Sequence, residues 1–346
     1  MRSRSNAKGV RPGSGPVTLA MVAELAGVSS STVSRILNGT AVVSAEKRQA
    51  IDDAIAKLGF VPNPVARGLA GGRTLSVGVI TQALDSPFYG ATLRGIELEL
   101  QAAGYSALFV SGHWNAAEEA RCIDVLRARR VDGIIVLTGR LSDSKLKECS
   151  KTIPVVVTGR NLKASQLYAF NFDQHEGARL ATKHLVELGH KRIAFITGDM
   201  EHPDARERER GYRAALSDAR IPFDKRLVVN GLYTEDSGMT AAAELLSRRR
   251  PFTAVFAAND QMALGAALCF HRQGLRIPGD VALVGFDDLP ACSYSYPPLS
   301  SVHHPANEIG RLAASAMLQL LQGLKPVIAI PSPTLKIRQS TEASAS

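Results

Sequence analysis

Short apolar runs alternate with amphipathic stretches through most of this chain, and this alternation constrains the fold more than any other feature. The runs are typical of buried strands and fall at 75–80, 107–111, 133–137, 154–158, 192–197, 227–230, 253–257 and 281–286. Between them, helical periodicity recurs at 89–103, 116–130, 174–188, 208–219, 234–249 and 261–273. A helix after each strand returns the chain to start a parallel strand, so the pattern predicts doubly wound α/β sheets.

The region after residue 75 is too long for one such sheet. Its rhythm restarts after irregular sequence near Asn171-Phe172-Asp173, so we expect two similar α/β lobes. Open parallel sheets bind ligands at the carboxyl ends of their strands. Two lobes that face each other at these ends would enclose a cleft.

A different pattern precedes the lobes. Residues 17–39 read VTLAMVAELAGVSSSTVSRILNG, with apolar residues at helical spacing on both sides of Gly27. Gly27 suits the left-handed end of a first helix, and Ser29 suits the cap of a second. Two short helices joined by a tight turn that contains Gly predict a helix-turn-helix.

The second of these helices has a polar side suited to DNA. At helical spacing, Ser30, Ser31, Ser34 and Arg35 lie together, opposite the apolar residues. Short polar side chains let a helix approach base edges, and an arginine can form paired hydrogen bonds with guanine or phosphate. An ordinary helical hairpin with a serine-rich face is the alternative, and the pattern favours DNA binding.

The charge distribution also favours nucleic acid. The chain carries a net charge of +9, of which residues 1–73 contribute +6, from ten Lys and Arg against four Asp and Glu. This is the distribution expected of a small nucleic-acid module attached to a near-neutral body. Residues 1–16 are rich in Gly, Pro, Ser and basic side chains, and predict a disordered basic arm.

Two further helices are predicted before the lobes. Residues 44–58 form the first, with Ser44 as its cap and Gly59 at its end. The second begins at Asn63-Pro64 and is about two turns long, too short to be stable alone. A flexible linker is the alternative. The two interpretations are compatible if this segment is a linker in the free protein and forms a helix only on DNA.

The stretch VAELAGVSSSTVSRILNG resembles the headpiece of the LacI/GalR family of bacterial transcription regulators. The resemblance continues through residues 43–48 and 58–63 and covers roughly 17–340. It implies a helix-turn-helix domain at 17–62, a hinge helix or linker at 63–73, and a periplasmic-binding-protein-like effector-binding and dimerisation domain at 74–340. Its first lobe would comprise about 74–172 and 303–334, its second about 173–302 and 335–340, with a tail at 341–346.

The resemblance and the helix faces together suggest which residues contact DNA. A homodimer would place two recognition helices in successive major grooves of a near-palindromic operator. By resemblance, Leu69 would wedge between base steps in the minor groove and Ala66 would pack in it. The expected DNA-binding residues are Thr18, Ser29, Ser30, Ser31, Thr32, Ser34, Arg35, Asn38, Asn63, Ala66, Arg67 and Leu69.

The cleft is expected to hold a small effector. From the strand-end loops of the first lobe come Phe88 and Trp114, which could stack on a sugar ring or merely fill the surface, and Arg160. Resemblance assigns the other effector-binding residues: Arg208, three residues before Gly211, then Tyr233, Asn259 and Asp287. We expect capping or turn roles for Asp260 and Asp288.

No pattern indicates catalysis, a cofactor or a metal site. His303-His304 lacks further ligands at metal spacing, and Asp287 and Asp288 are neighbours that point opposite ways. We therefore expect no enzyme of the sugar kinase or dehydrogenase type. A transport-type solute-binding protein is less favoured, because the N-terminus is basic and lacks the apolar core of a signal sequence. Scattered cysteines and the lack of a membrane-spanning run favour the cytoplasm.

The sequence therefore predicts a sequence-specific DNA-binding transcriptional regulator, most simply a repressor. Its effector would be a small molecule, with a sugar favoured, which acts through cleft closure and the hinge helix. The alternative is a regulator corepressed by a purine or nucleoside.

Overall fold

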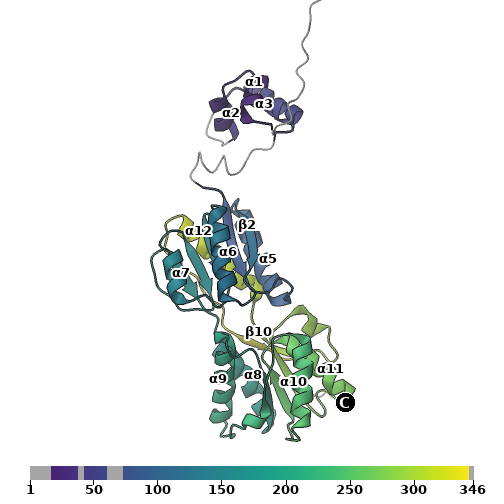
Figure 1. Cartoon of the computed structure of the whole chain (residues 1–346). Helices are drawn as coiled ribbons and strands as arrows, with labels where there is room; N and C mark the ends of the chain where they lie inside the picture. Colours follow the sequence, from purple (N-terminus) through teal and green to yellow (C-terminus); the bar gives the residue numbers. More distant parts are fainter. Residues whose placement is uncertain (1–16, 38–42, 61–72, 343–346) are drawn as a thin grey trace, which may run out of the picture. The chain divides into compact units, whose positions relative to one another are not determined.

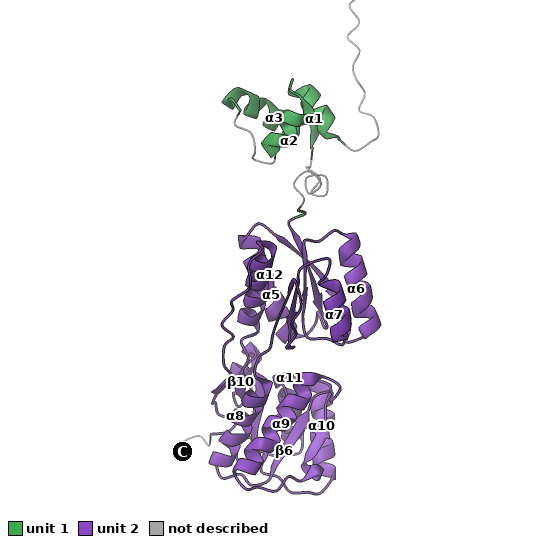
Figure 2. Cartoon of the chain, turned by 90° about the vertical axis from the view of Figure 1, so that its left-hand side faces the viewer, with its two compact units in different colours: residues 1–74 green, residues 75–346 purple. Residues whose placement is uncertain are grey.

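The computed structural model describes residues 17–37, 43–60 and 73–342. The chain divides into two compact units, residues 1–74 and 75–346 (Figure 2). We describe each unit by itself.

The described part of the first unit contains three helices, α1 (Leu19–Leu25), α2 (Ser30–Leu37) and α3 (Ala45–Leu58) (Figure 1). The side chains of Thr18 and Ser44 accept hydrogen bonds from the first turns of α1 and α3, as N-cap residues do. Gly27 follows α1 with φ of 65°, and this left-handed conformation confirms the predicted turn.

The helices of this unit surround a small core. It consists of Val22, Ala23, Val33, Ile36, Ile51, Ala54 and Phe60. In α2, Val33 and Ile36 are buried, whereas Ser30, Ser31 and Arg35 are exposed. The apolar side of α2 is therefore used for packing and its polar side remains accessible, as the helical spacing predicts.

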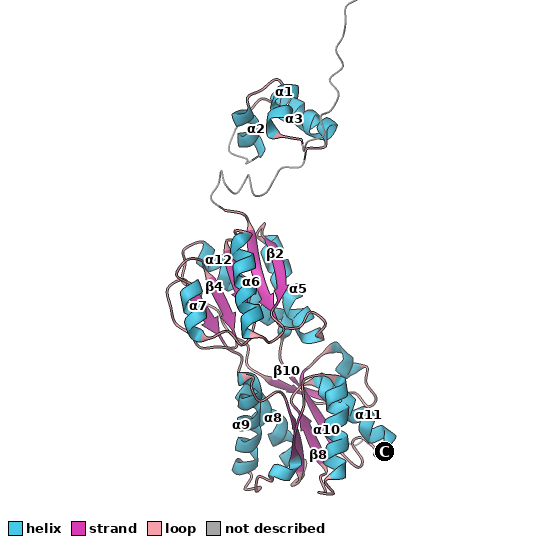
Figure 3. Cartoon of the chain, in the orientation of Figure 1, coloured by secondary structure: helices cyan, strands magenta, loops and turns pink. Residues whose placement is uncertain are grey.

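The first lobe of the second unit is built on a parallel sheet in the order β2-β1-β3-β4-β5 (Figure 3). Its strands are β1 (Ser76–Thr81), β2 (Ser106–Ser111), β3 (Gly133–Val136), β4 (Val155–Thr158) and β5 (Leu167–Phe170). Its helices are α5 (Pro87–Ala102), α6 (Ala116–Ala128), α7 (Asp143–Cys149) and α12 (Ala306–Leu321).

Both faces of this sheet are buried, because successive side chains of a strand point to opposite faces. In β1, Val77 and Val79 pack with α5 and α12, whereas Ile80 packs with α6 and α7. This explains why the strands read as continuous apolar runs rather than as alternating ones.

The second lobe has a sheet in the order β11-β10-β9-β8-β6-β7. Its strands are β6 (Ile193–Thr197), β7 (Val228–Asn230), β8 (Ala254–Ala257), β9 (Ala282–Asp287), β10 (Ser300–His303) and β11 (Thr334–Lys336), and all pairs are parallel except β10–β11. Its helices are α8 (Gln174–Glu187), α9 (Pro203–Asp218), α10 (Glu235–Ser247) and α11 (Asp260–Arg272).

The chain passes between the lobes three times, at 171–173, at 304–305 and at 322–333. After the second passage, α12 packs directly against α5 of the first lobe. A Cβ on Gly95 would lie 2.0 Å from the carbonyl oxygen of Asn307, and one on Gly310 would lie 2.0 Å from that of Thr92. Glycine at both positions therefore lets the two helix backbones approach closely.

The apolar runs of the sequence indicated neither β5 nor β10. β5 has four residues and two of them are only partly buried, so it lacks the apolar run of a central strand. β10 reads Ser-Ser-Val-His, with Val302 as its one apolar residue, and the sequence favours a crossover there. Both strands are fixed by their partners in the sheet rather than by local composition.

Candidate functional site

The polar side of α2 is the candidate nucleic-acid interface of the first unit. Ser29, just before the helix, accepts a hydrogen bond from the backbone N–H of Thr32 at 3.2 Å, as predicted for a cap. Its hydroxyl lies 2.9 Å from that of Ser31. Arg35 is exposed, and its Nε donates to the carbonyl oxygen of Ser31 at 3.3 Å.

The other expected DNA-binding residues divide into two groups. Thr18 caps α1 and is exposed, whereas Thr32 and Ser34 are partly buried on α2. The remaining five lie outside the described residues: Asn38, Asn63, Ala66, Arg67 and Leu69.

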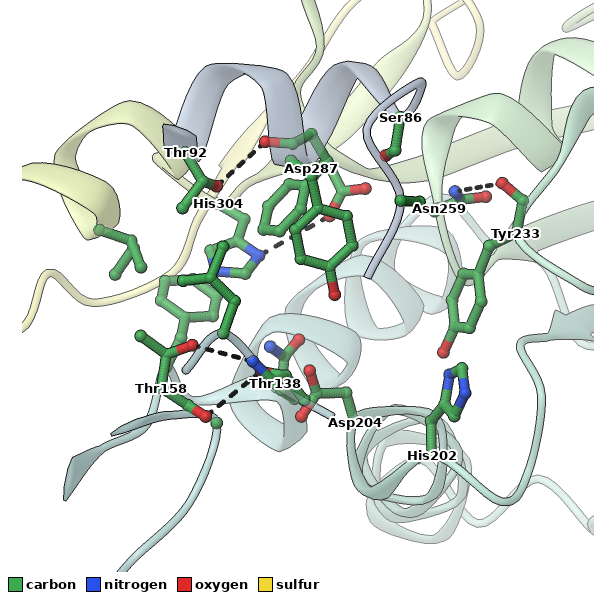
Figure 4. A pocket seen from close by; sticks show the side chains of 18 of the residues that line it. Ser86, Thr92, Thr138, Thr158, His202, Asp204, Tyr233, Asn259, Asp287 and His304 are labelled. Atoms are coloured by element: carbon green, nitrogen blue, oxygen red, sulfur yellow. Dashed lines mark hydrogen bonds and ion pairs between the residues drawn. The ribbon is translucent and has the colours of Figure 1, made fainter. Parts of the chain in front are cut away.

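A cavity of about 380 Å³ lies between the lobes of the second unit (Figure 4). Its lining residues follow the carboxyl ends of strands in both sheets, where parallel sheets place ligand sites. The volume falls in the range of small-molecule sites, roughly 300–1,000 Å³. Of the seven predicted effector-binding residues, six line it: Phe88, Trp114, Arg208, Tyr233, Asn259 and Asp287.

Arg208 and Asp287 form the charged part of the lining. Arg208 lies in α9 and is 5% exposed, and its Nη2 is 3.7 Å from Oδ1 of Asp287 at the end of β9. Its Nε donates to Oε1 of Gln174 at 2.9 Å, its Nη1 donates to the carbonyl oxygen of Ala258, and its guanidinium stacks 3.7 Å above the Phe286 ring. These partners fix the plane of the guanidinium.

Gly211 explains the spacing of the Arg-x-x-Gly motif. A Cβ at this position would lie 2.1 Å from the carbonyl oxygen of His175 in α8. The glycine therefore lets α9 pack closely on α8, and one helical turn earlier Arg208 reaches Gln174 of the same helix. The motif combines a packing residue and a lining residue.

Asn259 joins two loops of the second lobe at the cavity. Its Oδ1 accepts the N–H of Met262 at the start of α11, and its Nδ2 donates to the carbonyl oxygen of Tyr233. Tyr233 has φ of 64°, a strained conformation for a tyrosine, which this hydrogen bond helps to hold. Asn259 thus positions the Tyr233 ring besides lining the cavity.

Aromatic side chains from both lobes form one wall of the cavity. Trp114 stacks on His202 with ring centroids 3.8 Å apart, and the His202 ring lies parallel to that of Tyr233 at 5.7 Å. Where the chain crosses between the lobes, the His304 ring stacks on the Phe172 ring, with centroids 4.0 Å apart, and its centroid lies 4.7 Å from that of Phe88. Phe88 and Trp114 therefore face the cavity as well as neighbouring rings.

The prediction that Arg160 lines the cleft is wrong. Its Nη1 donates to Asp143 at 2.7 Å and its Nη2 to the carbonyl oxygen of Gly139 at 2.6 Å. These bonds hold the guanidinium within the loops of the first lobe. Thr158 and Gly159, just before it, contribute to the lining instead.

Several polar lining residues were missed by sequence reasoning, among them Asp199, His202, Asp204 and His304. His202 and Asp204 flank Pro203 at the start of α9, a strand-end position that could have indicated them. His304 belongs to a lobe crossing and gave no local signal.

Some buried polar atoms of the lining lack a hydrogen-bond partner. Among the described residues, these include Asn171 Oδ1, His202 Nε2 and His304 Nδ1. The two histidine nitrogens lie 3.5 Å from Asp199 Oδ2 and 3.7 Å from Asp287 Oδ1, respectively. Burial lowers the pKa of both histidines, so both rings are neutral at pH 7. Buried polar atoms ordinarily have partners, so these three are suited to a polar ligand.

Asp260 and Asp288 lie beside the site but have structural roles. Asp260 is fully buried and accepts from the N–H of Leu289 and the hydroxyl of Ser301. Asp288 accepts from Arg338 at 2.6 Å and lies 2.9 Å from Nδ1 of His303. Both tie loops to β10 rather than capping a turn, and Asp287 and Asp288 point apart as predicted.

Two searches of the described residues gave negative results. No group of three His, Cys, Asp or Glu side chains is arranged to hold a metal ion. No described helix has both the length and the apolar composition needed to cross a membrane.

Comparison with known proteins finds matches to both parts of the chain. Residues 18–63 match the family described as bacterial regulatory proteins, lacI family, and residues 182–341 match a periplasmic binding protein-like domain. The HTH-type transcriptional repressor PurR of Haemophilus influenzae is 32% identical over 94% of this chain and 99% of its own.

Solved structures show the same likeness. The lac repressor dimer bound to operator and the anti-inducer ONPF superposes with a TM-score of 0.84 and 30% identity, over 95% of this chain and 100% of that one. The complex of the regulator CelR with cellobiose superposes with a TM-score of 0.70 and 35% identity, over 94% and 99%. The chain therefore belongs to the lacI family of bacterial regulatory proteins and is a DNA-binding transcriptional regulator.

Proposed function

We propose that this regulator is a repressor that binds operator DNA as a homodimer and releases it when a sugar occupies the cavity. The observation that carries the proposal is the cavity lining. A fixed guanidinium, a carboxylate, and histidine and amide atoms without hydrogen-bond partners surround a space lined in part by aromatic rings. Sugar hydroxyls need such paired donors and acceptors, and sugar faces stack on aromatic rings.

The comparison with CelR supports a sugar, since its structure contains cellobiose. A purine or nucleoside remains the competing effector, and the experiment below includes it. We assign direct effector contacts to Arg208, Asp287, Phe88, Trp114 and Tyr233, and a positioning role to Asn259. We propose that the protein acts in the cytoplasm without enzymatic activity.

On the DNA side, we assign base or phosphate contacts to the exposed residues of α2, with Arg35 as the main specificity residue. Thr18 and Ser29 would contact the backbone beside it. Asn63, Ala66, Arg67 and Leu69 would act in the minor groove, as residues of a hinge.

An exposed apolar edge in the first lobe supports the homodimer. β2 is the edge strand of its sheet, and Leu108 and Phe109 on it are 36% and 37% exposed. An unpaired edge with apolar side chains is suited to association. The neighbouring α5 adds Leu98, which is 50% exposed.

Coupling between the sites follows from differential affinity. A sugar that binds more tightly to the closed lobes shifts the protein toward that state, and we propose that this state cannot hold two headpieces on the operator. The size of the shift is limited by the difference in sugar affinity between the two states.

An operator titration with and without ligands tests this proposal. Full-length wild type, Arg208→Ala and the matched control Arg210→Ala would be titrated against operator DNA with a panel of sugars and purine bases. Arg210 lies on the same helix, but is exposed and paired with Glu207. We expect a sugar to release wild type and Arg210→Ala but not Arg208→Ala, since truncation leaves Asp287 unpaired. Release by purines alone, or loss of operator binding in Arg208→Ala with folding intact, would contradict the proposal.

A further inference from the structure

Asp204 is a carboxylate of the cavity lining, and no cation of the described residues is paired with it. It is the second residue of α9 and lines the cavity, and Figure 4 shows its carboxylate projecting from the helix end. Within the described part of the chain, it accepts no hydrogen bond and forms no ion pair. By contrast, Asp287 faces Arg208 and His304, each at 3.7 Å.

The cations near the cavity are all committed to other groups. Arg208 is the one guanidinium of the described lining, and Gln174, Ala258 and Asp287 engage it. Outside the lining, Arg140 pairs with Asp199 at 2.8 Å and Glu201 at 2.6 Å. Arg160 pairs with Asp143, as described above. Each of these three arginines is therefore already paired with a carboxylate of the protein.

The neighbouring histidines do not compensate Asp204 either. Burial lowers the pKa of both His202 and His304, which leaves them uncharged at pH 7. Burial also raises the pKa of Asp204 to about 6, and repulsion from Asp287 adds to this shift although Arg208 opposes it. The cavity thus holds a desolvated carboxylate that forms no ion pair among the described residues, and Arg208 and Arg160 offset the effect of its burial only in part.

Aromatic groups lie around this carboxylate. Burial raises the pKa of the Tyr89 and Tyr233 hydroxyls, and the nearby charge of Asp204 contributes to both shifts. Tyr89 contacts Trp114 edge to face at 6.1 Å. Aromatic rings and a carboxylate that line the same cavity are a setting in which proteins bind ammonium groups, through cation–π attraction and an ion pair.

We infer that the cavity selects an effector that carries a protonated amino group, such as an amino sugar. Asp204 is the counter-ion of this ammonium group. Effectors that carry a negative charge are excluded. This inference rests on the proposed function, and it restricts the proposed sugar effector to sugars that carry a positive charge. An ammonium group near Asp204 would replace the interactions with water that the carboxylate loses on burial. A phosphate would instead be repelled by Asp204 and Asp287, and Arg208 is already paired with Asp287.

Calorimetry on the full-length protein tests the inference with matched ligands. The panel is glucose, glucosamine, N-acetylglucosamine and glucose 6-phosphate, together with cellobiose and the corresponding diglucosamine. Putrescine serves as an amine without a sugar ring. The variants are Asp204→Asn, which keeps the shape and removes the charge, and Glu207→Gln as control. Glu207 lies one turn further along α9, outside the lining, and is paired with Arg210. Operator affinity checks that each variant is folded.

We expect glucosamine or diglucosamine to bind wild type at least tenfold more tightly than its hydroxyl counterpart. Asp204→Asn should reduce this ratio to near one, and Glu207→Gln should keep it. If neutral or phosphorylated sugars bind as tightly as the amine, or the ratio persists in Asp204→Asn, the inference is overturned while the sugar effector stands. If only putrescine binds, and Asp204→Asn abolishes its binding, the selection of an ammonium group by Asp204 is supported and the proposal of a sugar effector is contradicted. If no ligand binds a protein that still binds operator, both fail.

Discussion

The indole of Trp114 stacks on the imidazole of His202 across the boundary between the two lobes, with ring centroids 3.8 Å apart and planes 21° from parallel. Trp114 follows β2 in the first lobe, and His202 precedes α9 in the second. The contact belongs to the cavity wall, so it depends on how the lobes face each other. Side chains that bind the effector therefore also join the lobes.

Trp114→Ala should weaken effector binding by roughly 2- to 12-fold, because an aromatic pair contributes about 0.5–1.5 kcal/mol beyond its buried area. A double-mutant cycle with His202→Ala, measured by calorimetry, isolates the pair. Trp114→Phe, which retains a ring, should show a smaller loss. Additive effects of the two alanine substitutions would contradict a direct contribution of the stack.

Arg140→Ala removes the ion pairs that link the loop after β3 to Asp199 and Glu201 of the other lobe. These side chains are partly exposed, so each pair should contribute at most about 1 kcal/mol. We expect a several-fold loss of effector affinity and a weaker salt dependence of that affinity. Arg121→Ala, which removes a surface pair with Glu118 within the first lobe, is the control. Equal effects of the two substitutions would argue against a link between the lobes.

Asp204→Asn should stabilise the unliganded protein at pH 7. Because the folded pKa of about 6 exceeds the usual 3.8, the wild type gains stability as pH falls from about 6 to 4 and has lost that gain above pH 6. The amide should therefore raise the free energy of unfolding by about 1–3 kcal/mol at pH 7, and by little below pH 4. Urea unfolding at both pH values measures the difference. An advantage that does not change with pH would contradict the charge assignment.

Arg35→Ala should cost about 1–3 kcal/mol of specific operator binding and relax the preference at one base pair, if the guanidinium reads a guanine. Arg35→Lys keeps the charge but loses the planar fork, so it should retain non-specific binding and lose specificity. Fluorescence anisotropy with operator and scrambled DNA at several salt concentrations measures both. Unchanged specificity in both variants would exclude base readout by Arg35.

Phe109→Asp should shift the dimer toward monomer, because it places a charge on the exposed edge of the first sheet. Sedimentation velocity at micromolar concentration measures the change. Leu188→Asp, at an exposed apolar position at the end of α8 in the other lobe, is the control and should leave the dimer intact. A wild type that sediments as a monomer would remove the basis of this prediction.

The sequence predicted the elements whose signals are local. Apolar runs indicated most strands of both sheets, helical spacing indicated most of the helices between them, and Gly27, Ser29 and Ser44 indicated helix ends. Arg160 failed because its partners, Asp143 and Gly139, lie on neighbouring loops that one sequence does not relate to it. His304 was missed for the same reason, whereas the strand-end position of Asp204 was a local signal left unused; the groups around both come from tertiary structure.

The packing of α12 on α5 has a consequence for the protein during its synthesis. The sheet of the first lobe is complete at Phe170, yet α12, which covers one face of it, begins at Ala306, 136 residues later. At about 5–20 residues per second, the ribosome needs roughly 7–27 seconds to reach that helix. Until then, the apolar face formed by Val77, Val79 and Ile135 has only part of its cover. The nascent first lobe is thus a predicted client for chaperones, and substitutions at Gly95 or Gly310 should reduce the yield of folded protein in cells.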